Sequence, residues 1–185
     1  MAVTFSLTSA TTSVGVQTAY EQNLTIGHEG MLADITDNTV ITGINETDAV
    51  LPFGVLVVQD AAGTAGNAVK TVVSDSAVAL GIAVDSFAFE TTKDGNDRPG
   101  YPDNQPVNVL TEGTIIVYSE EAVGVGDAVY VRTVASGTNY AGRFRKTLIS
   151  GKTSLVGNAQ FVSKTSGAGL ALVQVNGPRL TLTAN

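Results

Sequence analysis

This chain of 185 residues contains two nearly continuous apolar runs, Phe53-Gly54-Val55-Leu56-Val57-Val58 and Val78-Ala79-Leu80-Gly81-Ile82-Ala83-Val84. Runs of this length fit β-strands that are covered on both faces, as in the middle of a β-sandwich. Gly54 and Gly81 interrupt the runs, and a glycine inside a strand predicts a bulge or a close approach of another backbone. The two runs therefore indicate strands at the centre of a β-structured domain.

Outside these runs, apolar and polar residues alternate with a period of two. Val3, Phe5 and Leu7 alternate with serine and threonine, which is the pattern of a half-buried strand. No segment shows the helical repeat of apolar residues over a length that indicates a helix. The chain is therefore predicted to be all-β, an antiparallel β-sandwich or β-barrel. With the two apolar runs included, the strands predicted after the first segment are 39–44, 53–59, 68–74, 78–87, 106–110, 113–119, 128–134, 142–149, 158–163, 169–175 and 179–183.

Two regions differ from these segments. Residues 1–26 carry one charge, Glu21, and many serines and threonines, which predicts an extended N-terminal arm. This arm is either an ordinary first strand of its own sheet or a strand that reaches a neighbouring subunit. Residues 90–106 are polar and contain three of the five prolines, which predicts a long exposed loop. Residues 27–185 are expected to form the β-domain, in one piece or as two small lobes.

The charges are unevenly distributed along the chain. All seventeen acidic residues lie between Glu21 and Asp127, whereas only three of the ten basic residues precede Asp127. The chain therefore has a net charge of −14 up to Asp127 and of +7 beyond it. Such an asymmetry indicates a surface that meets other proteins. In the alternative interpretation, strands from both parts mix in one sheet and the asymmetry cancels in space.

The composition argues against several classes of protein. There is no cysteine, so neither disulfides nor thiolate metal ligands are available. No apolar run approaches the roughly 18–20 residues that cross a bilayer, and residues 1–5 do not resemble a signal peptide. We therefore expect a soluble protein with no membrane partner that is made in the cytoplasm. A sequence pI near 4.5 argues against a nucleic-acid partner.

Catalytic and ligand-binding motifs are also missing from the sequence. His28 is the only histidine, and no Gly-x-Ser-x-Gly turn presents a nucleophile that His28 and Asp34 could serve. The glycine motifs that bind phosphate are absent. Oxygen ligands in the polar loop do not follow the spacing of an EF-hand. We expect no catalytic residue, cofactor, metal or small-molecule substrate. The loop ligands are Asp94, Asn96, Asp97 and Asp103.

Residues 30–176 resemble a known protein family through a series of short motifs in matching order. The motifs are Gly30-Met31-Leu32-Ala33-Asp34, Leu51-Pro52-Phe53-Gly54, Leu80-Gly81-Ile82-Ala83-Val84, the segment from Val107 to Val117, Gly126-Asp127-Ala128-Val129-Tyr130-Val131-Arg132, Gly142-Arg143-Phe144 and the segment from Gly169 to Val175. Together they are similar to the structural cement (head decoration) proteins of tailed bacteriophages. The N-terminal arm and the polar loop are larger than is usual in that family.

The resemblance implies a non-enzymatic protein of the virion. Such a protein binds the outside of an assembled capsid and stabilises the shell against the pressure of the packaged DNA. Its partner is expected to be the major capsid protein, and closed symmetry favours a homo-oligomer, either a dimer or a trimer. The candidate contact residues come from the arm, the polar loop and a basic strand with alternating charge. They are Val3, Phe5, Leu7, Tyr20, Tyr101, Arg143 and Arg145.

A different class of function is a phage fibre or adhesin-type domain that binds host carbohydrate. Sugar sites favour exposed aromatic residues, and Tyr101 and Tyr140 are the candidates because both are expected in loops. The chain has no tryptophan, which lowers the expectation for this alternative.

Overall fold

The computed structural model describes residues 27–35, 37–74, 78–86, 92–177 and 180–183. These residues form strands and contain no helix, so the described part holds no helix that could cross a membrane. The strands are β1 (Thr39–Asn45), β2 (Leu51–Pro52), β3 (Leu56–Gln59), β4 (Ala68–Thr71), β5 (Ala79–Ala83), β6 (Thr92–Lys93), β7 (Pro99–Tyr101), β8 (Pro106–Ser119), β9 (Ala128–Arg132), β10 (Phe144–Arg145), β11 (Thr153–Phe161), β12 (Gly169–Val175) and β13 (Thr181–Thr183).

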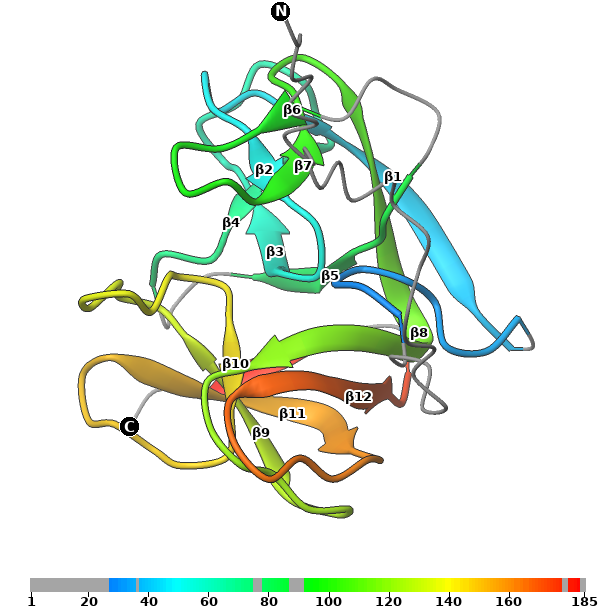
Figure 1. The fold of residues 1–185 in the computed structure, drawn as a ribbon. Helices are drawn as coiled ribbons and strands as arrows, with labels where there is room; N and C mark the ends of the chain where they lie inside the picture. Colours follow the sequence, from blue (N-terminus) through cyan, green and yellow to red (C-terminus); the bar gives the residue numbers. More distant parts are fainter. Residues whose placement is uncertain (1–26, 36, 75–77, 87–91, 178–179, 184–185) are drawn as a thin grey trace, which may run out of the picture.

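Five strands close into a barrel in the upper part of Figure 1. β1 pairs with β4 in parallel, and antiparallel pairs then join β4 to β3, β3 to β5, β5 to β8 and β8 back to β1. Of β8, only residues 106–112 take part in the pairing with β1. We call this unit the N-terminal barrel. Its buried interior includes Val55, Val57, Val69, Val107 and Val109.

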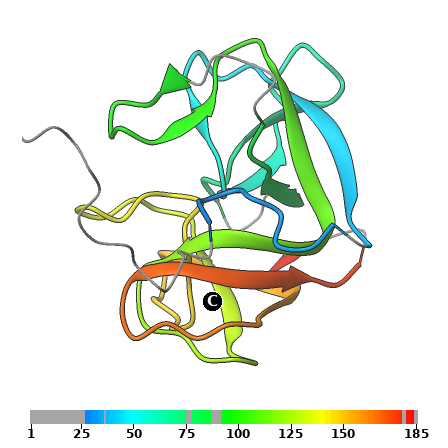
Figure 2. The ribbon, with the colours of Figure 1, turned by 45° about the vertical axis from the view of Figure 1, so that its right-hand side comes forward.

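The second half of β8, residues 113–119, belongs to another closed set of strands. Antiparallel pairs join β8 to β12, β12 to β11, β11 to β9 and β9 to β10. β10 then returns to β8 in parallel at a single pair, Phe144 with Ser119. Figure 2 shows β12 running alongside β8 in this unit, which we call the C-terminal barrel. Its buried residues include Ile115, Val131, Phe144, Phe161 and Val173.

One hydrophobic cluster continues from one barrel into the other. Leu56, Ile82 and Leu110, from strands of the N-terminal barrel, are fully buried in the same cluster as Phe144 and Phe161. Successive side chains of a strand point to opposite faces, so β3 and β5 can fill their own barrel and also cover this second core. The two barrels therefore share both a strand and a core.

The uneven charge of the sequence is also uneven in space. β8 is the one strand in the described residues that serves both barrels, and its second half joins a unit whose other strands come from the basic part. Residues 39–112 carry three basic and ten acidic residues, a net charge of −7. Residues 113–175 carry six basic and three acidic residues, a net charge of +3. The asymmetry is therefore smaller between the two barrels than along the sequence, but it does not cancel.

The segment expected to be a long exposed loop contains part of a small separate sheet. β6 and β7, both within residues 90–106, form this sheet with β2. Tyr101 in β7 is 1% exposed, and its ring packs edge-on against Phe53 at 5.0 Å between centroids. The Tyr101 hydroxyl donates to the carbonyl oxygen of Val84 at 2.6 Å. The prediction of Tyr101 as an exposed contact is therefore wrong, because its ring belongs to the core.

The all-β prediction is confirmed, and of its two forms the barrel is the one observed. Two of the pairings, β1–β4 and β10–β8, are parallel, so the sheet is mixed rather than antiparallel. The run at 53–58 is buried throughout and the run at 78–84 is mostly buried, although Val78 at its start is 60% exposed. The glycines of both runs have the expected roles. Gly54 adopts a φ of 67°, and a Cβ on Gly81 would lie 2.1 Å from the carbonyl oxygen of Leu110.

Several strand boundaries differ from the prediction. Residues 106–110 and 113–119 form one strand, whereas the strand expected at 142–149 is limited to β10. Gly142 is in a turn with a φ of 86°, and the Glu121 carboxylate accepts the backbone N–H groups of Lys146 and Thr147. The turn at Gly142 precedes β10, and the bonds to Glu121 take the backbone out of the sheet after it. The predicted arm at residues 1–26 lies outside the described residues.

Candidate functional site

A buried ion-pair network connects three elements of the C-terminal barrel. Arg132 of β9 is 2% exposed and donates from Nε and Nη2 to the two carboxylate oxygens of Glu120, at 2.5 and 2.6 Å. Arg145 of β10 donates to the same carboxylate at 3.3 Å and pairs with Glu121 at 3.2 Å. Bidentate pairs of this kind fix geometry, and loss of one partner leaves a buried charge uncompensated. The charge of Arg145 is thus neutralised inside the molecule.

Arg143 lies in a stack of alternating cationic and aromatic side chains. Its guanidinium carbon is 4.1 Å from the ring centroid of Tyr118 and 5.2 Å from that of Tyr140. The guanidinium carbon of Arg98, from the β6–β7 hairpin, also lies over the Tyr140 ring, 4.3 Å from its centroid. Glu29 accepts a hydrogen bond from Arg143 at 3.4 Å. Burial raises the pKa of Glu29, although the charges of Arg143 and Arg98 favour its ionised form.

The two arginines expected at a contact surface are therefore largely occupied by internal partners. The side chains of Arg143 and Arg145 are 13% and 12% exposed. Their carboxylate partners are distant in sequence, so strand alternation alone could not reveal them. A direct contact of either arginine with a capsid stays a prediction. The other candidate contacts, Val3, Phe5, Leu7 and Tyr20, lie outside the described residues.

The aromatic residues proposed for carbohydrate binding are also occupied. Tyr101 is in the core, and Tyr140 is half-buried beside Arg98 and Arg143. Neither ring is the freely exposed platform that stacking on a sugar requires. The described residues therefore offer no support for the fibre or adhesin alternative at these two positions.

A triad drawn from the sequence would pair His28 with Asp34, and the described partner of His28 is Asp85. A recess of about 330 Å³ opens beside His28, with Phe53, Pro99 and Leu170 in its lining. The recess is open to solvent, and its lining is mainly apolar. Within the described ranges, no group of three or more histidine, aspartate or glutamate residues is placed to hold a metal ion.

The oxygen ligands of the polar loop are not gathered at one point. The Asp94 carboxylate accepts from the backbone and side chain of Arg98, and Asp97 pairs with Lys93. Asp103 accepts the backbone N–H of Asp48 instead. These carboxylates therefore stabilise a hairpin turn and its neighbouring loop.

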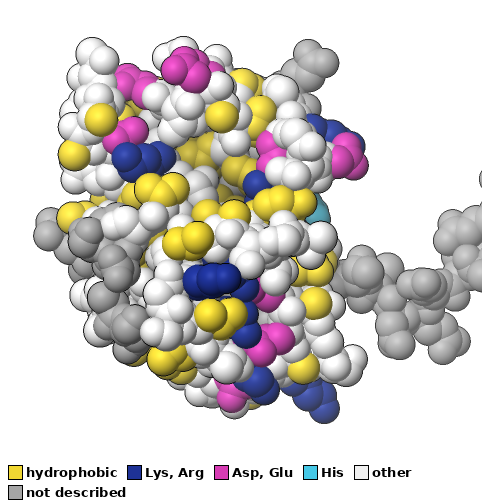
Figure 3. All heavy atoms as spheres, turned by 90° about the vertical axis from the view of Figure 1, so that its left-hand side faces the viewer, with side chains coloured by type: hydrophobic (Ala, Val, Ile, Leu, Met, Phe, Trp, Pro, Cys, Tyr) yellow, Lys and Arg dark blue, Asp and Glu magenta, His cyan; other side chains and the backbone are white. Residues whose placement is uncertain are grey.

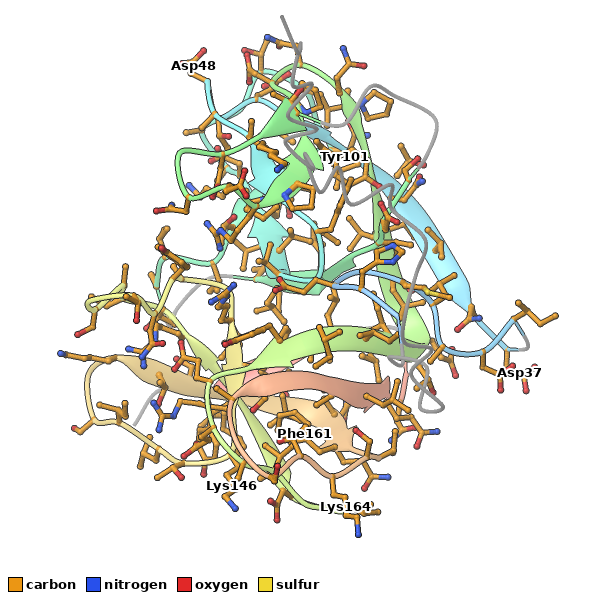
Figure 4. All side chains as sticks on the ribbon, viewed as in Figure 1. Asp37, Asp48, Tyr101, Lys146, Phe161 and Lys164 are labelled. Carbon is orange, nitrogen blue, oxygen red and sulfur yellow. The ribbon has the colours of Figure 1, made fainter. Side chains whose placement is uncertain are left out.

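Exposed charges remain at the two ends of the molecule after these internal pairs are formed. Figure 4 places Asp48 at the upper end, in the N-terminal barrel, and Lys146 and Lys164 at the lower end, in the C-terminal barrel. On the face drawn in Figure 3, lysine and arginine side chains lie along the lower half with acidic side chains beside them, and both signs of charge are also present in the upper half. We call the end of the C-terminal barrel that carries Lys146 and Lys164 the basic pole, and the end of the N-terminal barrel that carries Asp48 the acidic pole.

Comparison with known proteins gives the family of this chain. The model of the family described as structural cement protein (E217 gp24/Pam3 gp6) matches residues 16–176. The chain belongs to the structural cement protein family. The role of this cement protein is structural and associated with the phage capsid, and it is a protein of the virion. The family resemblance found in the sequence is thus confirmed, and the family implies a role without catalysis.

A solved structure shares the fold of this cement protein. A chain in "The capsid of Myoviridae Phage XM1" matches with a TM-score of 0.66 and 18% sequence identity. The match covers 89% of this chain and 99% of that chain. A search of curated proteins gives no match.

Proposed function

We propose that this chain binds the outer surface of an assembled phage capsid, through the major capsid protein, and stabilises the shell. The observation that carries the proposal is the family match over residues 16–176. The fold supports it, because two closed barrels that share a strand and a core make a stiff body. A stable contact buries roughly 1,200–2,000 Å² in total. Many equivalent sites on one shell then multiply a modest affinity per site through avidity.

Reconstitution on isolated shells tests this proposal. Purified chain is mixed with shells that lack it, and the particles are sedimented and imaged by electron microscopy. We expect saturable binding, added density on the outside of the shell and a higher temperature of shell disruption. Density on the inside, or saturated shells that break at the same temperature as bare ones, would contradict the proposal.

The N-terminal arm is the first part of the chain that we expect to contribute. The alternating residues Val3, Phe5 and Leu7 suit addition to a strand of a neighbouring protein. Deletion of residues 1–20 should lower the occupancy of shells in co-sedimentation. A matched variant keeps the length of the arm and replaces the three apolar residues with serine. Full occupancy of both variants would exclude the arm as a contact.

Assembly of the chain with itself is proposed as well. Closed symmetry favours a dimer or a trimer, either in solution or on the shell. Light scattering after size-exclusion chromatography measures the mass of the free protein against the 19.0 kDa of one chain. A monomer in solution that also occupies isolated, well-separated positions on the shell would contradict an oligomer.

A further inference from the structure

The basic pole is built from lysines rather than from the arginines that the sequence emphasises. Arg132, Arg143 and Arg145 are engaged by Glu120, Glu121 and Glu29 within the fold. By contrast, Lys146 and Lys164 are exposed. Lys146 has a carboxylate neighbour in Asp127, but at 3.6 Å and at an exposed position. An exposed pair of this kind contributes little, so the lysine charge stays available to a partner.

Exposed apolar side chains lie close to these lysines. Val125 is 71% exposed and sits two residues from Asp127, the neighbour of Lys146. Leu148 is 41% exposed and follows Lys146 by two residues. Thr165, next to Lys164, donates its backbone N–H to the carbonyl oxygen of Val123. These contacts bring three loops together. We call the resulting surface the basal patch, defined as Val125, Lys146, Leu148 and Lys164.

The opposite end of the molecule has the opposite charge. The basic residues of residues 39–112 are all held in ion pairs, Lys70 with Asp60, Lys93 with Asp97 and Arg98 with Asp94. Exposed carboxylates remain in the N-terminal barrel, Asp48 at its far end and Glu112 where β8 passes into the C-terminal barrel. With a net charge of −7, the whole chain is repelled on average by an acidic surface. The chain can approach such an acidic surface favourably only when its basic pole faces that surface.

We propose that the basal patch is the face of this protein that docks on the capsid, and that it fits an acidic protein surface with an apolar centre. This inference rests on the proposed function and names the surface that carries it out. The mixture of lysines with exposed Val125 and Leu148 matches a protein interface, in which an apolar centre is surrounded by charge. Charge complementarity sets the orientation, because the acidic N-terminal barrel is turned away from the shell.

Two double lysine variants with the same change in total charge distinguish an effect of the basal patch from an effect of total charge. Lys146→Gln with Lys164→Gln removes two charges from the basal patch. The control, Lys93→Gln with Lys152→Gln, removes two charges from exposed lysines outside it. We expect the patch variant to bind shells about tenfold more weakly at low salt, as small electrostatic contributions from two sites add. The difference should shrink near 0.5 M salt, where screening acts within a few Å. The control should bind as the wild type does.

Cross-linking gives a second readout that does not depend on affinity. Because the chain has no cysteine, Ser166→Cys beside the patch and Asp48→Cys at the opposite end each provide one site for a photoreactive label. We expect cross-links to the capsid protein from position 166 and not from position 48.

Three outcomes would overturn the inference. Equal weakening of the two lysine variants would show that only total charge matters. Cross-links from position 48 alone would show that the acidic pole, rather than the basal patch, faces the capsid. Binding of the wild type to shells would in that case still uphold the proposed function. Binding to duplex DNA as tight as to shells would make nucleic acid the partner. If the wild type does not bind shells at all, the proposed function fails and the patch assignment fails with it.

Discussion

Arg132 is among the largest fully buried side chains in the described residues, and its charge is balanced by Glu120, whose side chain is 1% exposed. Desolvation of two such groups is costly, and it is offset because Arg132 donates to both oxygens of the carboxylate, at 2.5 and 2.6 Å. The pair therefore fixes the relative position of β8 and β9 more than it adds net stability. Loss of one partner should be far more harmful than loss of an exposed pair.

Replacement of Arg132 by methionine tests this difference. We expect the free energy of unfolding to fall by about 3–5 kcal/mol, because the buried charge of Glu120 then keeps only the longer hydrogen bond from Arg145. The exposed pair Lys93–Asp97 is the control, since Lys93→Met should cost at most about 1 kcal/mol. Chemical denaturation measures both values. Similar small losses in the two variants would show that the buried pair has no special role.

Glu29 and Glu121 should affect stability with opposite dependence on pH. Burial raises the pKa of Glu29, so its contribution is complete below its unfolded value of 4.5 and is lost as the pH rises through the folded pKa. Burial opposes ionisation of Glu121 too, but hydrogen bonds from Thr147 and the charge of Arg145 outweigh it and lower its pKa. The contribution of Glu121 is therefore present above 4.5 and is lost as the pH falls through the folded pKa.

Urea unfolding of Glu29→Gln and Glu121→Gln between pH 3 and pH 7 checks these signs. Relative to the wild type, Glu29→Gln should gain stability as the pH rises. Glu121→Gln should lose stability as the pH rises. The same slope for both variants would contradict the environments described for these carboxylates.

At the level of strands, β8 organises the fold because each half of it pairs with different neighbours. Residues 106–112 pair with β1 and β5, and residues 113–119 pair with β12. The β5 contact is close enough that Gly81 has no room for a side chain beside Leu110. A methyl group there must displace backbone, which is much harder than moving the end of a side chain.

Gly81→Ala should therefore destabilise the protein by about 1–3 kcal/mol, the usual cost of overpacking. Gly167→Ala is the matched control, because a Cβ at Gly167 meets no atom within 4 Å. Thermal unfolding of the two variants measures the difference. An equal melting temperature for both would mean that β5 and β8 can separate without loss.

Sequence alone predicts best those strands that have one buried face and one solvent-facing face. The alternating segment at 169–175 is observed as β12 with the same bounds, because one face is buried and the other is not. β6 and β7 could not be predicted, since their polar residues form a hairpin only by pairing with β2. Likewise, the partners of Arg143 and Arg145 arise from the fold, so the sequence reveals the basic residues but not their neutralisation.

At the level of the whole molecule, the two barrels are expected to unfold together. They share β8, and the cluster that contains Phe144 and Phe161 also contains Leu56 and Ile82. Unfolding of one barrel alone would expose to water the part of this cluster that the other barrel contributes. Calorimetry should therefore show a single transition whose calorimetric and van't Hoff enthalpies agree. Two separated transitions, or hydrogen exchange that frees one barrel alone, would contradict this expectation.

The shared strand also has a mechanical consequence. A force that pulls the two barrels apart along β8 acts on the covalent backbone of a single continuous strand. To extend the molecule in that direction, the hydrogen bonds that flank β8 must be sheared together rather than opened one after another. We therefore expect the two barrels to resist mechanical separation more strongly than two domains joined by a flexible linker.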